Sequence, residues 1–274
     1  MSLGAAILVA CGSGSGGFGD GTFAIIANTD IGAGEVPARI LIGMVGEDGA
    51  RLGDPETQIE VEVAPATDLG ATQRAEAEFD WIVENAVGLY RASFVFDSPG
   101  VWWMTVEPQG GAPLDRVAFN VTADTATPNV GEPAAVTATP TLRDFDMVEL
   151  TTDPEPDPRF YELSLDEAIS NGRRTVLTFS TPAYCQTAAC GPLLQTVKDT
   201  ADAYPDTNFI HVEVYTGLTD PDFAPDPAHL APSVAPEFWN LPSEPWVFVI
   251  DSNGLVTARF EGVMSAKELT DALG

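Results

Sequence analysis

The feature that most constrains this chain is a pair of cysteines, Cys185 and Cys190, within the stretch TPAYCQTAACGP. A run rich in strand-forming residues, 175–179, precedes the pair, and a helix-like run, 193–201, follows it. The N-terminus of a helix stabilises a thiolate, which serves both as a nucleophile and as a metal ligand. The position therefore predicts thiol chemistry at a strand-to-helix junction.

The spacing of the two cysteines leaves two arrangements open. On an uninterrupted helix, residues five apart point about 140° away from each other, and a disulfide needs Cα atoms within about 7 Å. Either Cys185 lies in the loop before the helix and reaches Cys190 in the first turn, or the two do not pair with each other. We favour the first arrangement because Pro192 suits a first helical turn.

Length and charge limit what the rest of the chain can do. The chain has 274 residues, of which 45% are hydrophobic, enough for two domains with their own cores. It carries 41 acidic and 12 basic residues, a formal net charge of -29. Such a field repels nucleic acids and anionic lipid headgroups, so we expect no nucleic-acid partner and no electrostatic contact with a membrane.

The first 19 residues predict an exported, lipid-anchored protein. Residues 8–11, LVAC, have the pattern of a bacterial lipobox, in which Cys11 becomes the lipidated N-terminus, and a Gly/Ser-rich tether follows. The apolar run is shorter than a usual signal peptide and lacks a basic start. We expect the chain to lie on the extracytoplasmic face of the cell membrane and to contact the membrane only through this anchor. Cys185 and Cys190 then remain as one pair in an oxidising compartment.

Residues 20–124 predict an all-β domain of immunoglobulin-like architecture. The segment Ile59–Val63 alternates apolar and charged side chains, which is typical of a half-buried strand. Seven short runs at this spacing, separated by turn signals, predict a small β-sandwich. The runs are 23–27, 38–45, 58–63, 79–84, 89–96, 101–107 and 116–121.

Residues 125–158 predict a Pro-rich acidic linker, of which 142–150 is apolar enough to dock on a domain. Residues 159–274 alternate helix and strand and predict an α/β domain. Capping-box patterns at Ser164–Glu167 and Ser265–Glu268 indicate two helix starts. Strands are expected at 175–180, 209–215, 246–250 and 255–260.

This order of motifs resembles the thioredoxin-like superfamily. Glu244 and Pro245 directly precede a buried strand, where that family places its cis-proline, and the form TPxYCQTxxCGP is similar to a group of exported bacterial thioredoxin-like proteins. The resemblance implies a thioredoxin-like fold over 159–274 and thiol–disulfide exchange with an extracytoplasmic thiol or disulfide protein. It assigns the attack to Cys185, resolution of the mixed disulfide to Cys190, and substrate positioning to Pro245 and Glu244. No cofactor is expected for this exchange.

Three departures from the family pattern leave the activity open. The pair is spaced C-x4-C instead of C-x2-C, and Thr178 stands where the family has a buried Asp that assists proton transfer. Glu244 would place a carboxylate beside the sulfurs, which raises a thiol pKa. A non-catalytic thioredoxin-like scaffold is therefore one alternative to an oxidoreductase.

A copper-handling protein of the Sco type is the other alternative, because thiolates and imidazoles suit copper. Its metal ligands would be Cys185, Cys190 and His229, the last from a Pro-rich loop. His211 falls inside a predicted strand and is expected to be a packing residue.

Overall fold

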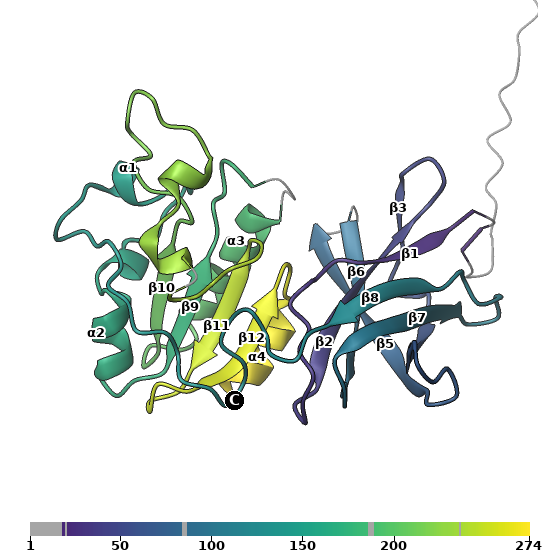
Figure 1. The fold of residues 1–274 in the computed structure, drawn as a ribbon. Coiled ribbons are helices and arrows are strands. Elements are labelled where there is room, and N and C mark those ends of the chain that lie inside the picture. The colour runs from purple at the N-terminus through teal and green to yellow at the C-terminus, as the bar shows by residue number, and fades with distance from the viewer. Residues whose placement is uncertain (1–17, 20, 84–86, 186–188, 236) are drawn as a thin grey trace, which may run out of the picture.

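The computed structural model describes residues 18–274, except 20, 84–86, 186–188 and 236. The predicted lipidation site, Cys11, lies outside the described residues. Two sheets lie side by side, one formed by the first half of the chain and one by the second half (Figure 1). Within the described part, no helix combines the length and the apolar character that crossing a membrane requires.

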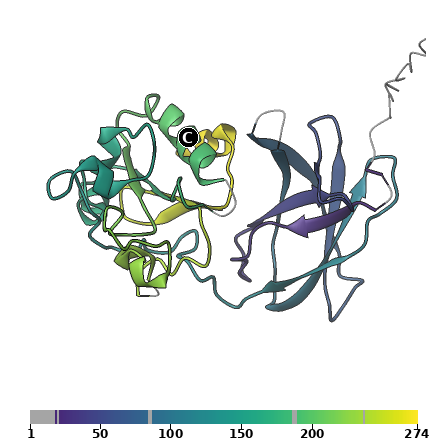
Figure 2. The same ribbon diagram turned by 90° about the horizontal axis from the view of Figure 1, so that it is seen from above.

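The first sheet curls into a nearly closed barrel. Its strands follow the order β1-β2-β6-β5-β4-β7-β8, with β3 paired to β2, and every neighbouring pair is antiparallel. The chain after β1 returns to the far edge, where the Thr122 amide donates to the Ile31 carbonyl at 2.9 Å. The strands are β1 (Phe23–Ile26), β2 (Ala38–Val45), β3 (Arg51–Leu52), β4 (Ile59–Pro65), β5 (Gln73–Val83), β6 (Val87–Phe94), β7 (Gly100–Pro108) and β8 (Val117–Val121). Seen from above, they wrap around a common interior (Figure 2).

Alternation along the strands gives the barrel an apolar interior. On β4, Val61 and Val63 are fully buried, while Glu60 and Glu62 between them are partly exposed. On β7, Trp102 faces inward and packs edge-on against Phe96, with ring centroids 4.9 Å apart. Burial of such apolar side chains, at about 1.5–3 kcal/mol each, is what holds this sheet in its curled form.

The second sheet has the order β10-β9-β11-β12. β9 (Thr175–Phe179) and β10 (Asn208–Val212) are parallel, and β11 (Trp246–Ile250) is antiparallel to both β9 and β12 (Val256–Glu261). Every residue of β9, β10 and β11 is buried, because helices and turns cover both faces. The covering elements are α1 (Met147–Leu150), η1 (Pro158–Tyr161), α2 (Leu165–Ser170), α3 (Cys190–Ala201), η2 (Pro227–His229), η3 (Pro232–Val234) and α4 (Ala266–Leu273).

Both predicted capping boxes are present. Ser164 and Glu167 cap the start of α2, and Ser265 and Glu268 cap the start of α4. Each box satisfies backbone N–H groups that the first helical turn leaves without a partner.

The segment 125–158, predicted as a linker, runs along the second sheet. The Gly131 amide donates to the Val256 carbonyl at 2.8 Å, and the Val256 amide donates to the Glu132 carbonyl at 2.9 Å. Farther on, Leu150 of α1 is buried in the core that covers one face of the sheet. Backbone hydrogen bonds and apolar contacts thus hold this stretch against β12 and its neighbours.

The predicted fold class, an immunoglobulin-like sandwich followed by an α/β thioredoxin-like fold, is wrong. The structure is mostly β, with 32% strand and 16% helix, and its described residues show no clear α/β thioredoxin domain. The N-terminal strands form one continuous barrel-like sheet instead of two packed sheets. In the second half, the described residues of the connection from β10 to β11 form the 3-10 turns η2 and η3 and no α-helix. Prolines recur in this connection at positions 221, 225, 227, 232 and 236, and a proline inside a helix removes a backbone hydrogen bond and clashes with the preceding turn, so the helix–strand alternation stops there.

A buried polar network joins the two sheets. Asp30, in the loop after β1, forms a 2.5 Å ion pair with Arg259 of β12, and the two side chains are 3% and 11% exposed. The amides of Thr29 and Asp30 donate to Glu261 at 2.9 and 2.8 Å. Arg39 of β2 donates two hydrogen bonds to Glu268 of α4. These contacts set the position of the barrel against the second half of the chain.

Candidate functional site

Cys185 and Cys190 form a disulfide, which confirms the pairing that we favoured. Their Cα atoms are 6.0 Å apart, and Cys185 lies in the loop before α3. α3 begins at Cys190, and the residue before it offers no side-chain cap. Instead, the Cys190 amide donates to Cys185 Sγ at 3.3 Å. The Sγ atom of Cys185 therefore occupies the place of a capping acceptor at the helix N-terminus, where positive potential is highest.

The two sulfurs differ in access to solvent. Cys190 is fully buried, whereas Cys185 is half-buried and follows the exposed Tyr184. A partner molecule can therefore approach Cys185 and not Cys190.

The cysteine loop starts where two parallel strands end. The Ser180 amide donates to the Val212 carbonyl at 3.2 Å, and the Val214 amide donates to Thr181 Oγ1 at 3.2 Å. β9 and β10 thus deliver their last residues to one edge of the sheet, as parallel strands do. Side chains that follow β10 consequently lie near those that lead to Cys185.

Glu244 and Pro245 also meet this edge. The Glu244–Pro245 peptide is cis, as the resemblance implies. Glu244 is hydrogen-bonded to both the backbone and the side chain of Thr181, four residues before Cys185. Burial raises the pKa of Glu244, and these hydrogen bonds offset part of that rise. Their roles in substrate positioning stay predictions.

Glu213 is a buried acid that the sequence reasoning missed. Its Oε1 accepts hydrogen bonds from Thr151 Oγ1 at 3.1 Å, from the Thr152 amide at 2.5 Å and from Thr152 Oγ1 at 2.8 Å. Burial raises the pKa of Glu213 to about 7. Thr152 Oγ1 in turn accepts from the Ala183 amide at 3.1 Å, which links the acid to the cysteine loop.

The signal for Glu213 was present but ambiguous. His211 and Glu213 alternate with apolar residues, a pattern typical of a strand with one solvated face, whereas here the segment 125–161 and η1 cover that face. Thr178 is buried too, and among the described residues its Oγ1 has no hydrogen-bond partner. Glu213, which directly follows β10, is therefore the buried acid at this edge of the sheet.

His211 packs inside the protein, as expected. Its Nδ1 lies 2.6 Å from the Tyr161 hydroxyl, and its Nε2 lies 2.9 Å from Ser180 Oγ and 3.0 Å from the Ser180 carbonyl. Burial lowers the pKa of His211 to about 4, so the ring is neutral at pH 7.

His229 is the last residue of η2. Its Nδ1 is 3.2 Å from Asp226, and its ring is 5.2 Å from that of Phe223, which is also 5.2 Å from Tyr184. Within the described ranges, no group of three His, Cys, Asp or Glu side chains is arranged to hold a metal ion. The two sulfurs of the alternative copper set are bonded to each other.

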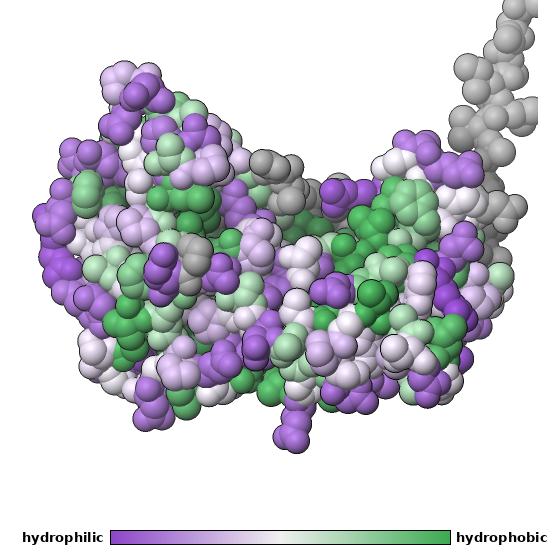
Figure 3. Space-filling model, in the orientation of Figure 1, coloured by the Kyte–Doolittle hydropathy of each residue, from purple (hydrophilic) through white to green (hydrophobic). Residues whose placement is uncertain are grey.

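An apolar groove of about 650 Å³ runs between the two sheets beside the disulfide. Ala189, which precedes Cys190, packs there against Leu41 and Leu89 of the barrel and against Val263. Glu244 lines the same groove. Figure 3 shows the hollow between the two halves of the molecule, with apolar residues on the barrel side.

No protein-family model and no curated protein matches the chain. Among solved structures, the chain is similar to the filamin domain of Lin-41, at 12% sequence identity and a TM-score of 0.25. That match covers 40% of this chain and 99% of the filamin domain. A likeness at this TM-score identifies neither a fold nor a function.

Proposed function

We propose that the Cys185–Cys190 pair carries out thiol–disulfide exchange with an extracytoplasmic thiol or disulfide protein. The proposal rests on the chemistry of the pair and not on a fold class. The observation that carries it is the hydrogen bond from the Cys190 amide to Cys185 Sγ at the start of α3. In the reduced chain this donor and the helix dipole favour the thiolate form of Cys185, which is the form that attacks a disulfide.

The difference in burial supports distinct roles for the two cysteines. The half-buried Cys185 is the nucleophile, and the fully buried Cys190 resolves the mixed disulfide. A purely stabilising disulfide is the competing interpretation, but closing a loop this short restricts the unfolded chain by only about 2 kcal/mol. Each half of the chain already has a large apolar core.

The exchange balances in two steps. The Cys185 thiolate attacks one sulfur of a partner disulfide, and the partner's other sulfur leaves as a thiolate. Cys190 then loses its proton and attacks Cys185 Sγ, which releases the partner's first sulfur as a second thiolate. The partner is reduced by two electrons, the chain returns to the disulfide of the structure, and a dithiol reductant restores the starting state.

Lipidation at Cys11 would hold the chain on the extracytoplasmic face of the cell membrane, where disulfides persist. The TPxYCQTxxCGP motif is the basis for proposing a relationship to exported thioredoxin-like proteins. Both statements depend on the sequence pattern alone.

The test is to measure the reduction potential of the pair against dithiothreitol and to assay insulin reduction. Cys185→Ser should abolish activity, while Cys190→Ser should trap a mixed disulfide with the substrate. Cys11→Ser is the matched control, because it removes the third cysteine and keeps the pair, and it should leave the rate of insulin reduction unchanged.

A pair that stays oxidised in excess dithiol, together with insulin reduction no faster than in Cys185→Ser, would contradict the proposal. The disulfide would then be a stabilising link in a non-catalytic scaffold.

A further inference from the structure

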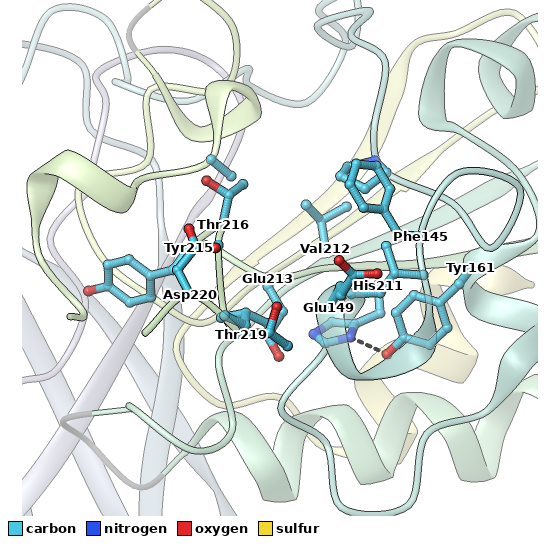
Figure 4. Close-up of a pocket in the computed structure, with 15 residues that line it drawn as sticks. Phe145, Glu149, Tyr161, His211, Val212, Glu213, Tyr215, Thr216, Thr219 and Asp220 are labelled. Carbon is cyan, nitrogen blue, oxygen red and sulfur yellow. Dashed lines mark hydrogen bonds between the residues drawn. The ribbon is translucent and has the colours of Figure 1, made fainter. Parts of the chain in front are cut away.

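A second site lies at the end of β10. A cavity of about 210 Å³ opens between α1, η1, the end of β10 and the loop 216–220 (Figure 4). It exceeds the roughly 150 Å³ cavity that accommodates a benzene molecule. The half-exposed Phe145 stands among its lining residues, which places the mouth of the cavity near α1. The cavity is therefore large enough for one small organic molecule.

The charged groups that line the cavity are all carboxyls. They belong to Glu149, Glu213 and Asp220, and the lining contains neither Lys nor Arg. His211 is neutral, and both of its ring nitrogens lie within hydrogen-bond distance of Tyr161 or Ser180. The Tyr161 hydroxyl is occupied by His211. The cavity therefore offers mainly acceptors and negative charge, which suits a ligand that brings donors and positive charge.

Glu213 supplies the group that points to a ligand. It is 4% exposed, and three donors converge on its Oε1. Its Oε2 is buried and has no hydrogen-bond partner among the described residues. Leaving such an acceptor unpaired destabilises the folded chain, and more so when the group is charged. In Figure 4, Glu213 lies between Tyr161 and His211 on one side and Thr219 and Asp220 on the other.

We propose that this cavity binds a small organic cation, a primary ammonium group on a short apolar body. The ammonium donates to Glu213 Oε2 and is drawn in by Glu149 and Asp220 at the rim. The apolar body packs against Leu150 and the ring of Phe145, and the ring also attracts a cation through its face. This site stands apart from thiol exchange, because none of its ligand-facing groups is a cysteine.

The neighbouring charges leave Glu213 available to such a ligand. Asp153 is already paired with Lys198 at 2.7 Å, and both side chains are largely buried. No cation of this neighbourhood is paired with Glu213, and its Oε2 has no hydrogen-bond partner among the described residues.

The test measures binding of benzylammonium by calorimetry at about 150 mM salt, where the Debye length is about 8 Å and general attraction to the acidic surface is weak. Benzyl alcohol is the neutral probe of the same shape. We expect saturable one-to-one binding of benzylammonium or, for a narrower cavity, of n-butylammonium. Each amine should bind at least tenfold more tightly than its alcohol.

Glu213→Gln keeps the shape of the side chain and should weaken amine binding at least tenfold, and Glu149→Gln should weaken it less. Glu162→Gln removes an exposed acid outside the cavity and should leave the affinity unchanged. An intact disulfide and an unchanged circular dichroism spectrum check that each variant is folded.

Three outcomes overturn the proposal: no saturable binding of either amine, equal binding of an amine and its alcohol, or equal loss of affinity in the Glu213 and Glu162 variants. Because the readout needs no redox activity, this test fails or succeeds independently of the cysteine pair.

Discussion

The two sheets bury different kinds of side chain. The residues of the barrel's core cluster are apolar, with Trp102, Phe96 and Tyr90 among the largest. The second sheet buries Thr178 and His211 along β9 and β10, and Glu213 just beyond. A buried polar group costs stability unless it is hydrogen-bonded. The barrel thus contributes cohesion, and the second sheet gives up some stability to keep polar groups at the strand ends that carry both candidate sites.

The largest loss of folding stability should come from a substitution in the barrel interior. Trp102→Ala removes a side chain that is 2% exposed and packs against Phe96 and Phe119. We expect a loss of up to about 5 kcal/mol in the free energy of unfolding, since the cavity cannot fully collapse. Urea denaturation followed by far-UV circular dichroism measures it.

Trp103→Ala on the same strand is the matched control, because Trp103 faces outward and is only partly buried. A loss as large as that of Trp102→Ala would mean that the alternation of β7 does not separate core from surface.

The strands of the barrel could be predicted, but their arrangement could not. Apolar alternation located β2, β4 and β7 to within two residues of their observed bounds. The start of β5 was missed, because Arg74, Glu76 and Glu78 are charged residues on the outer face, and only alanines lie between them. Whether such strands divide into two sheets or curl into one depends on which edges pair, and alternation within a strand does not encode its neighbours.

A substitution at the contact between the two sheets should cause the next largest loss of folding stability. Asp30→Ala leaves the buried Arg259 without its partner, at a cost of about 4 kcal/mol. The double variant Asp30→Ala/Arg259→Met should recover the part of that loss that comes from the unpaired guanidinium, whereas the amides of Ala126 and Thr127 still lack the acceptor that Asp30 provided. Urea titrations of both variants test this, and a double variant no more stable than the single one would show that the loss comes from those amides and not from the unpaired guanidinium.

The candidate sites were only half visible in the sequence. Cys185, Cys190 and Pro245 lie in local motifs, and the structure brings the cysteines together as their spacing allowed. Glu213 gains its role from Thr151 and Thr152, about sixty residues earlier, a pairing that no local pattern announces. Asp30 and Arg259 are even farther apart in the sequence, so no local pattern could predict the ion pair between the two sheets.

The buried acid at the end of the second sheet should make the folding stability depend on pH, by a smaller amount than the two losses above. The pKa of Glu213 is about 7 in the folded chain, against 4.5 when unperturbed. The folded state therefore holds this proton more tightly, and the stabilisation is complete below pH 4.5 and lost as pH rises through 7. At about 1.4 kcal/mol per unit, the loss reaches about 3 kcal/mol.

Glu213→Gln isolates that contribution. The difference in unfolding free energy between wild type and variant should shift in favour of the variant from pH 4.5 to 7 and then level off. His211, whose folded pKa is lowered to about 4, contributes equally to both proteins and cancels. A difference that does not change with pH would place Glu213 in a solvated environment.

The smallest effect should come from the charged outer face of the barrel. Arg74 bridges Glu60 and Glu62 across β4 and β5, but all three side chains are substantially exposed. Water and salt screen such pairs, and holding a long side chain in one geometry costs entropy. Arg74→Ala should therefore lower the urea midpoint slightly at low salt and not at all at high salt. A loss that persisted in high salt would mean that Arg74 acts by packing its aliphatic stem on the sheet, and the outer face of the barrel would then contribute to its cohesion as the interior does.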